Sequence, residues 1–411
     1  MHVLTTVVGQ RTEHWIDLLT TLIDQTGIEL TLCAADVSPL AAQSLAELDR
    51  GRERFHFHHL PHVLGEGRTG HMASALFRPG SLRTLRQVRP DVLHVIGEAA
   101  YLSTFQALHL RNRHWPTTPI TLYAAQNTMM RLPFPFPSLE QYAYRTVAHA
   151  FPITPAALEL LRVKGYQGPA SIVPLGVDTT AFQPTPAVGS RPFSVGFVGR
   201  LEPHKGIRDL LHGSELLDCD LIVVGEGSLR KEVERAAARR PGRIRLYSWL
   251  DHGELPSILA RMDALVLPSL EVVQRNVVPW IGIPLREQFG RVLVEAMACG
   301  VPVVGSDVGE IPYVVESAGL IYPAGEVSAM ACRLAQIRDD PDLARRLGAT
   351  GRSRAEKQFA WAEIAKTMHH TWQELAVTAE RLNGHHRQRY VINDKRPDLV
   401  RFVQPDEGKA L

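Results

Sequence analysis

Two glutamates, Glu287 and Glu295, lie on either side of a Phe-Gly turn that opens a short apolar helix. A helix that begins after a glycine presents free N–H groups, and these groups and the helix dipole both favour a phosphate. Carboxylates beside a phosphate site are badly placed to bind the phosphate, but they can accept hydrogen bonds from hydroxyl groups attached to it. The pattern therefore points to a ligand that joins phosphate to sugar hydroxyls, as a nucleotide-sugar does.

Two basic residues, Arg200 and Lys205, follow the apolar run 193–198, which is expected to be a buried strand. Ligands of parallel sheets bind beyond the carboxyl ends of the strands, where cations can hold a diphosphate. If Arg200 and Lys205 are considered alone, the alternative interpretation is a basic strand-to-helix loop that binds no ligand. Gly225 and Gly227 follow the next expected strand, and glycine there lets a ligand approach the backbone closely.

The elements that must position these residues are short apolar runs, which alternate with helical stretches through both halves of the chain. The alternation predicts an α/β fold of two doubly wound, parallel-sheet, Rossmann-like domains facing a cleft. The segment 182–192, which is rich in proline, interrupts the pattern and predicts a linker. Domains are expected at 1–184 and 192–360, then a helix at 361–380 and a tail of unreadable role at 381–411. Strands are expected at 3–8, 29–35, 54–58, 92–96, 120–124, 148–153, 171–173, 193–198, 220–224, 244–248, 264–267, 301–305 and 320–322.

Composition and charge limit the class of protein. The 411 residues suggest two or three domains, and a hydrophobic content of 45% is enough for substantial cores. A net charge of +2 gives no support for a nucleic-acid partner. The N-terminus lacks a leader pattern, and no run approaches about 18 apolar residues. Four widely separated cysteines predict reduced thiols in a cytoplasmic protein: Cys33, Cys219, Cys299 and Cys332.

Taken together, these motifs resemble the retaining glycosyltransferases of family 4, the group 1 glycosyl transferases, which have the GT-B fold. The chain has a Gly-Arg-x4-Lys-Gly turn, a Val-Gly-x-Gly turn, Pro268-Ser269, and a Glu-x7-Glu segment that starts at Glu287, all in family order. The ending Phe359-Ala360-Trp361 is also similar. The resemblance covers about residues 1–376 and implies a hexosyltransferase that uses a nucleoside-diphosphate-sugar.

The resemblance also implies roles for single residues. Arg200 and Lys205 would neutralise the diphosphate, Glu287 would bind hydroxyls of the transferred sugar, and Glu295 would hold the ribose. The backbone at Phe289, Gly290 and Arg291 would contact sugar and phosphate, and the turn at Trp249 and Leu250 would lie near the base. Gly9 lies in the turn after the first strand, where the family often has two glycines. The single glycine weakens the case that the backbone approaches the transferred sugar closely at this turn.

Polar residues after two strands of the first half are candidates for contact with the acceptor or the sugar. These residues are Glu98, Gln126 and Asn127, and capping of strand ends is the alternative. The acceptor would be a glycan, a lipid-linked sugar or a small metabolite. The segment 270–286 is longer than expected in the family, and it either shapes the donor or acceptor site or is a surface elaboration.

Three other patterns favour structural roles. Asp218 and Asp220 form an Asp-x-Asp pair suggestive of manganese, but the pair lies at the start of a strand, away from the ligand edge. The histidines at 56, 58, 59 and 62 suggest a metal site, yet their alternation with Phe55 and Phe57 is typical of one face of a strand. Arg83, Arg86 and Arg89 share a side of a short helix, which favours a solvated face over a weak contact with anionic lipid.

The sequence therefore predicts a retaining glycosyltransferase that uses a UDP- or GDP-linked sugar and needs no metal or other cofactor. Catalysis would rest mainly on positioning and charge stabilisation. A sugar phosphorylase or nucleotide-sugar epimerase on the same fold is the alternative enzyme. A non-catalytic sugar-nucleotide-binding subunit is the other alternative. The oligomeric state is left open.

Overall fold

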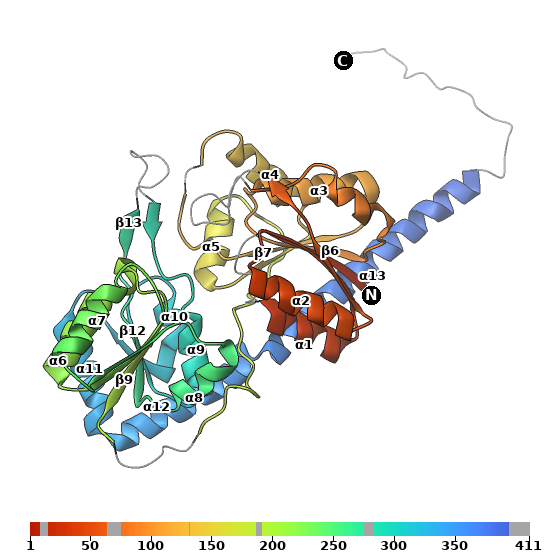
Figure 1. The fold of residues 1–411 in the computed structure, drawn as a ribbon. Helices are drawn as coiled ribbons and strands as arrows, with labels where there is room; N and C mark the ends of the chain where they lie inside the picture. Colours follow the sequence, from red (N-terminus) through yellow and green to blue (C-terminus); the bar gives the residue numbers. More distant parts are fainter. Residues whose placement is uncertain (9–14, 64–74, 131, 186–190, 275–282, 394–411) are drawn as a thin grey trace, which may run out of the picture.

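The computed structural model describes residues 1–8, 15–63, 75–130, 132–185, 191–274 and 283–393 of the chain. They form two α/β units, each with a six-stranded sheet covered by helices (Figure 1). All neighbouring strands in both sheets are parallel. The predicted fold class, two doubly wound Rossmann-like domains, is confirmed.

The N-terminal sheet has the strand order β3-β2-β1-β6-β7-β8. Its central strands are mostly apolar and buried along nearly their whole length, as expected for strands covered on both faces. Its strands are β1 (His2–Val8), β2 (Glu29–Ala35), β3 (Phe55–His59), β6 (Val92–Ile96), β7 (Ile120–Ala124) and β8 (His149–Pro152), with a small hairpin of β4 (His62–Val63) and β5 (Leu76–Phe77). Its helices are α1 (Ile16–Thr26), α2 (Pro39–Gly51), the 3-10 helix η3 (Ser81–Gln87), α3 (Leu102–His114), α4 (Phe136–Thr146) and α5 (Pro155–Val163).

The C-terminal sheet repeats this plan with the order β11-β10-β9-β12-β15-β16. Its strands are β9 (Ser194–Val198), β10 (Asp220–Val224), β11 (Ile244–Tyr247), β12 (Ala264–Leu267), β15 (Val303–Ser306) and β16 (Gly319–Tyr322), with an antiparallel hairpin of β13 (Val272–Gln274) and β14 (Ile283–Leu285). Its helices are α6 (Ile207–Leu217), α7 (Arg230–Arg239), α8 (Leu255–Leu259), α9 (Arg291–Ala298), α10 (Ile311–Val315), α11 (Val327–Asp339) and α12 (Pro341–Arg354), with short turns η4 (Pro203–Lys205), η5 (His252–Glu254), η6 (Glu316–Ala318) and η7 (Ala355–Phe359).

Each sheet has a topological switch point, where the chain leaves two adjacent strands in opposite directions. In the N-terminal sheet this point lies between β1 and β6, and in the C-terminal sheet it lies between β9 and β12. The crevice beyond the carboxyl ends of such a strand pair is the usual ligand position in open α/β sheets. The loops that follow β9 and β12 are therefore the first place to look for a site.

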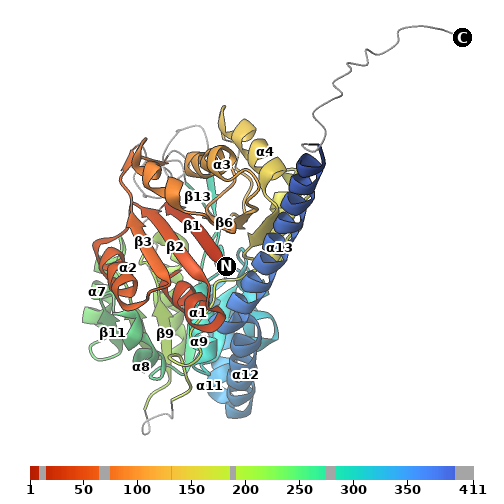
Figure 2. The same ribbon diagram turned by 90° about the vertical axis from the view of Figure 1, so that its right-hand side faces the viewer.

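The chain crosses between the two units twice, and the two crossings are hydrogen-bonded to each other. The Val177 N–H donates to the Phe359 carbonyl at 2.8 Å, and the Trp361 N–H donates to the Val177 carbonyl at 3.1 Å. Just beyond the first crossing, Arg352 donates to the carbonyls of Thr179, Phe182 and Ala298, which fixes this stretch to the C-terminal unit. After the second crossing, the 33-residue helix α13 (Trp361–Asn393) packs against α1 and runs along the N-terminal unit (Figure 2).

Most expected strands lie where the apolar runs placed them, but one does not exist. Residues 171–173 were expected to be a strand and form none. The Ser171 and Val173 N–H groups donate to β8 carbonyls, and only an isolated bridge at Ala170 results. Pro169 and Pro174 border this stretch, and proline carries no N–H group with which to continue a ladder. The hairpins β4–β5 and β13–β14 were not anticipated, and β13–β14 occupies the segment 270–286.

Other surface expectations can now be located. Arg83, Arg86 and Arg89 are all exposed on and beside η3. Cys33, Cys219 and Cys299 are buried, Cys332 is exposed, and all four are free thiols. Among the described helices, none has the length and apolar character required to cross a membrane.

A buried histidine joins α13 to the N-terminal sheet. His94 on β6 is 2% exposed and packs against the ring of Trp372 from α13, with ring centroids 5.3 Å apart. The Thr121 hydroxyl accepts from the Trp372 indole N–H at 3.1 Å and lies 2.9 Å from the His94 Nδ1. Burial lowers the pKa of His94 from 6.5 to about 3. The imidazole is therefore neutral in the folded protein.

This burial makes a pH-dependent contribution to stability. A depressed histidine pKa stabilises the fold fully above the unfolded pKa of 6.5, and the contribution is lost as the pH falls through 6.5 toward 3. Between pH 7 and pH 5, His94 should lower the free energy of unfolding by about 2 kcal/mol. In His94→Asn that part of the pH dependence should disappear, whatever the variant's stability at pH 7. Urea unfolding at several pH values measures it, and equal pH slopes in the two proteins would contradict it.

Candidate functional site

A buried ion pair lies at the switch point of the C-terminal sheet. The Lys205 Nζ, at the end of η4, is 2.5 Å from the Glu287 Oε2, and both side chains are largely buried. The same carboxylate oxygen accepts from the Ser269 hydroxyl at 2.8 Å. These three residues come from the β9–α6 loop, the end of β12 and the segment before α9. The structure thus brings together residues that are up to 82 positions apart in the sequence.

The surroundings of Glu287 keep its carboxyl group ionised. Burial acts to raise the pKa of this carboxyl, but the charge and hydrogen bond of Lys205 and the hydrogen bond of Ser269 outweigh it and lower the pKa. An ionised carboxylate only accepts hydrogen bonds. Glu287 is therefore suited to hold hydroxyl groups and not to donate a proton.

More positive charge lies beside this pair. The Arg200 Nη2 is 3.4 Å from the His204 Nε2, and His204 feels the charges of both Lys205 and Arg200. Burial and these two cations lower the pKa of His204. With His204 neutral, Arg200 and Lys205 are the two cations beside this site, and the carboxylates of Glu287 and Glu202 lie close enough to interact with them.

The N-terminus of α9 opens beside the same carboxylate. Gly290 is the N-cap residue with φ of 81°, and no side chain caps the helix. The first N–H groups of an uncapped helix are available to an anion. Phe289 is 2% exposed and packs edge-on against Phe359, so its side chain belongs to the core and only its backbone faces the site.

Glu295 sits one turn into α9 in a second polar cluster. Its Oε1 lies 3.0 Å from the Arg291 Nε and 2.9 Å from the His252 Nε2. Both partners approach Asp17 on α1, because its Oδ2 lies 3.5 Å from the Arg291 Nη2 and 3.9 Å from the His252 Nδ1. The expected ribose carboxylate is therefore held at a junction between the two units.

The two glycines of the predicted Val-Gly-x-Gly turn are required by packing within the protein. A Cβ atom on Gly225 would lie 1.9 Å from the Gly199 carbonyl oxygen, and one on Gly227 would lie 2.5 Å from that of Leu201. Close packing of the two turns therefore explains these glycines without a ligand. Trp249 is 54% exposed after β11, and Leu250 is partly buried. Gly9 lies outside the described residues.

The three candidates of the N-terminal unit have different environments. The Glu98 Oε1 accepts from the Ala125 and Gln126 N–H groups at 2.9 and 2.8 Å, which is the capping role. The Gln126 Oε1 accepts from Lys164 at 2.8 Å. Asn127 contacts the C-terminal unit, because its Nδ2 donates to the Glu287 main-chain carbonyl at 3.0 Å.

The sequence did not single out Glu310, which shares this contact. Its N–H donates to the same Glu287 carbonyl at 3.1 Å, and its carboxyl is 6% exposed with Thr154 and Asn127 as donors. Burial raises the pKa of this carboxyl. His252 and Asp17 were also missed. Only the position of His252 just after the expected base turn was a signal.

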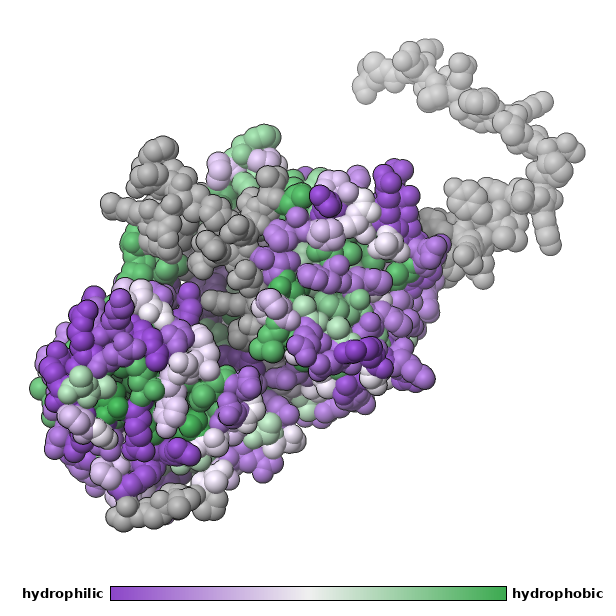
Figure 3. All heavy atoms as spheres, viewed as in Figure 1, coloured by the Kyte–Doolittle hydropathy of each residue, from purple (hydrophilic) through white to green (hydrophobic). Residues whose placement is uncertain are grey.

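A cavity of about 750 Å³ lies between the two units beside Glu287. The space-filling view shows a recess between the two lobes with hydrophilic residues on its walls (Figure 3). Asn127 and Ala156 contribute from the N-terminal unit, and the C-terminal unit contributes both ends of the β13–β14 hairpin and the loop after β15. Among the described residues, the lining is Asn127, Ala156, Leu270, Glu271, Val272, Arg286, Asp307, Val308, Gly309, Glu310 and Ala324.

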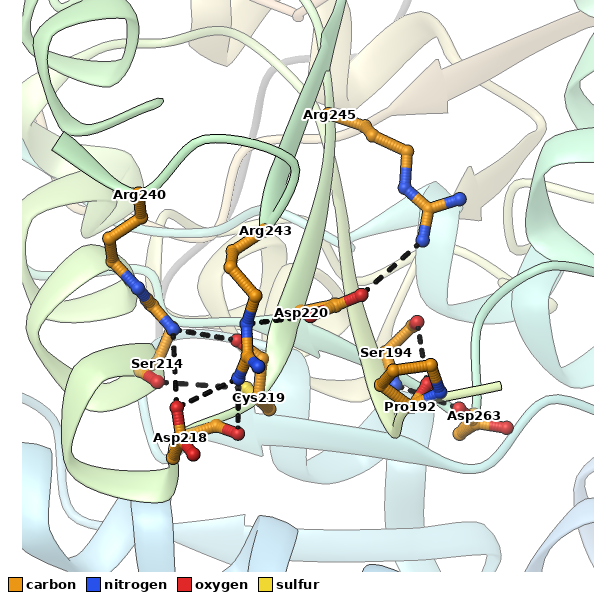
Figure 4. A network of polar contacts seen from close by, with 10 residues as sticks. All are labelled: Pro192, Ser194, Ser214, Asp218, Cys219, Asp220, Arg240, Arg243, Arg245 and Asp263. Carbon is orange, nitrogen blue, oxygen red and sulfur yellow. Dashed lines mark hydrogen bonds and ion pairs between the residues drawn. The ribbon is translucent and has the colours of Figure 1, made fainter. Parts of the chain in front are cut away.

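The Asp-x-Asp pair lies at the other end of its strand and is bound by arginines (Figure 4). Asp220 is 5% exposed, and its carboxylate lies 2.9 Å from the Arg243 Nε and 3.6 Å from the Arg245 Nη2. Asp218 is exposed and lies 2.8 Å from the Arg243 Nη2. The structural interpretation of this pair holds. In the described part of the chain, no three His, Cys, Asp or Glu side chains gather as a metal site would require.

Residues 179–354 match the family of group 1 glycosyl transferases. Among characterised proteins, the MMP alpha-(1->4)-mannosyltransferase of Mycolicibacterium hassiacum is 33% identical over 205 residues, which is 47% of this chain and 46% of that protein. The glycogen synthase of Mycobacterium tuberculosis is 31% identical over 183 residues, or 42% of this chain and 41% of that protein. The matches thus span less than half of these relatives' own length.

Solved structures share the fold over nearly the whole chain. HepE of Anabaena in complex with UDP superposes with a TM-score of 0.68 at 16% identity, over 91% of this chain and 100% of that one. Sucrose-phosphate synthase of Thermosynechococcus elongatus gives 0.66 at 18% identity, over 92% and 100%. At such identity the likeness concerns the fold, which is the GT-B arrangement of two Rossmann-like domains.

The arginine cluster at Asp220 yields a test of its structural role. Asp220→Asn keeps the shape of a buried side chain but loses two ion pairs, so it should lower the free energy of unfolding by about 2 kcal/mol. Asp218→Asn, on an exposed side chain, is the control and should stay within about 0.5 kcal/mol. Thermal and urea unfolding give both values. A melting temperature raised by Mn²⁺ in the parent protein but not in Asp220→Asn would contradict the assignment.

Proposed function

We propose that this chain is a retaining glycosyltransferase of family 4 that transfers a hexose from a nucleoside-diphosphate-sugar to an acceptor hydroxyl. The observation that carries the proposal is the cluster of Lys205, Glu287 and Ser269 at the switch point of a sheet, with Arg200 and the start of α9 beside it. This cluster lies within the segment that matches group 1 glycosyl transferases. It offers cations to a diphosphate and a fixed carboxylate to sugar hydroxyls in one place.

In the proposed reaction the bond between the sugar C1 and the diphosphate oxygen breaks, and the diphosphate leaves with the electron pair. The acceptor oxygen forms the new bond to C1, and its proton passes to the departing diphosphate oxygen. Negative charge grows on the diphosphate as the bond breaks, so Arg200 and Lys205 stabilise the transition state more than the bound donor. Glu287 holds the sugar hydroxyls while positive charge develops at C1.

The charge distribution also supports retention without a metal ion. Glu287 is the one carboxylate that the described residues place against Lys205, and that ion pair and Ser269 occupy one of its oxygens. We therefore assign Glu287 to positioning and leave attack to the acceptor, on the face from which the diphosphate departs. Arg200, Lys205 and the α9 N-terminus would supply the positive charge that a metal supplies elsewhere.

Three alternatives are possible on the same fold. A sugar phosphorylase or a nucleotide-sugar epimerase would give a sugar phosphate or an epimer without a second carbohydrate. A sugar-nucleotide-binding subunit would bind the donor without turnover. The cavity beside Glu287, which leaves about 750 Å³ for a second molecule, favours transfer over all three.

Binding of nucleotide-sugars tests the proposal directly. UDP- or GDP-linked hexoses should raise the melting temperature of the protein, because a ligand that binds only the folded state stabilises it. Glu295→Ala should weaken donor binding, since a ribose contact is similar in the ground and transition states. Glu287→Ala should lower turnover far more than donor affinity. Equal losses of donor affinity in both variants with unchanged turnover would mean that the two roles are misassigned.

The two cations should act as a unit. Arg200→Ala and Lys205→Ala should each lower turnover at saturating donor by about a hundredfold, and the double variant should lose less than the product of the two. Lys205→Ala should also move the acid limb of the pH–rate profile to higher pH, because burial would then raise the pKa of Glu287 against the weaker opposition of Ser269 and His204 alone. Steady-state kinetics at several pH values measure both effects. Near-native turnover in the double variant would remove the diphosphate assignment.

A further inference from the structure

We propose that the cavity beside Glu287 is the acceptor site, and that it takes an uncharged, hydroxyl-rich group such as a sugar or polyol and rejects anionic acceptors. The inference rests on the proposed glycosyl transfer and names the class of its second substrate. It assigns a task to the β13–β14 hairpin, whose bases form one wall of the cavity.

The position of the cavity ties it to the reacting centre. Leu270 directly follows Ser269, and Arg286 directly precedes Glu287. The two ends of the hairpin are therefore next in sequence to the Glu287 carboxylate, which is assigned to the sugar hydroxyls, and to its hydrogen-bond donor Ser269. On the opposite wall, Asn127 donates to the Glu287 carbonyl. An acceptor in this space would lie next to the segments that place Glu287, and so beside the transferred sugar.

The charges of the lining separate the cavity from the donor site. Among the described lining residues the one cation is Arg286, which is paired with Glu271 through contacts of 2.8 and 3.2 Å. Two further carboxyl groups, those of Asp307 and Glu310, have no cation among the lining residues. The described lining is thus neutral to negative, with Asp307 as its unpaired carboxylate and Glu310 inclined to the protonated form, whereas Arg200 and Lys205 supply cations to the donor site. A phosphate or carboxylate on the acceptor would meet like charges, which is an effective way to exclude a wrong ligand.

The same lining suits a sugar ring. The Asp307 Oδ1 accepts from the Ala324 N–H at 2.9 Å, and the carboxylate retains further acceptor capacity for hydroxyl groups. Glu310, which burial inclines to the protonated form, and Asn127 offer both donors and acceptors. Between them lie small apolar surfaces that fit the C–H faces of a ring, from Ala156, Leu270, Val272, Val308 and Ala324.

The test uses the full chain, its nucleotide-sugar, and matched acceptors: methyl hexosides, hexose 6-phosphates and hexuronic acids. The parent protein should transfer to a neutral hexoside at least about tenfold faster than to its anionic counterparts. Ala324→Trp and Ala156→Trp fill the cavity from opposite units, and each should lower transfer more than about tenfold with nucleotide binding unchanged. Ala349→Trp, on an exposed part of α12, is the matched control. Asp307→Lys should shift the preference toward hexose 6-phosphates.

Each other outcome has a defined meaning. Faster transfer to anionic acceptors by the parent protein overturns the inference, and so does native transfer by both tryptophan variants. Donor binding and hydrolysis without transfer to any neutral hexoside also overturns it. If no nucleotide-sugar binds, the proposed function itself fails, and thermal shift with UDP- and GDP-linked hexoses distinguishes that case from the others.

Discussion

The ion pair between Lys205 and Glu287 is the contact on which the candidate site depends. Burying two charges costs free energy, and such a pair persists where hydrogen bonds from its surroundings satisfy it, as Ser269 does here. The pair draws the loops after β9 and β12 to the start of α9. It also fixes the ionisation state of Glu287. Lys205 thus binds the carboxylate that sugar hydroxyls would share, and a bound diphosphate would compete for the same ammonium group.

The main chain of Glu287 is held as firmly as its side chain. Its carbonyl accepts from Asn127 of one unit and from the Glu310 N–H of the other. A second set of contacts between the units, Asp17 with Arg291 and His252, lies at Glu295. Both glutamates of the Glu-x7-Glu segment therefore lie at contacts between the units, Glu287 through its main-chain carbonyl and Glu295 through Arg291 and His252. Any change in the relative position of the units must alter the geometry of both.

The sequence predicted best what depends on local pattern. The strands at 29–35, 92–96, 120–124, 220–224 and 264–267 agree with the structure to the residue, because continuous apolar runs specify strands buried on both faces. The cluster of Arg200, Lys205 and Glu287 was found because each residue follows a strand end or opens a helix. The roles of Asp17, His252 and Glu310 come from contacts between distant segments, and no local spacing encodes such contacts. Glu98 makes the strand-end hydrogen bonds that its alternative, capping interpretation predicts, and its contact with the acceptor stays a prediction.

The paired crossings at Val177 and Phe359–Trp361 determine how the two units can move. The two segments are paired in parallel. Segments joined by hydrogen bonds bend together far more easily than they slide past each other, since sliding would break the bonds at 2.8 and 3.1 Å. Arg352 holds one side of this junction to the C-terminal unit, and α13 holds the other side to α1. A relative motion of the two units would therefore turn about this junction. Opening would be a hinge rotation of one unit relative to the other, with the smallest displacement beside Val177 and larger displacements at the β13–β14 hairpin.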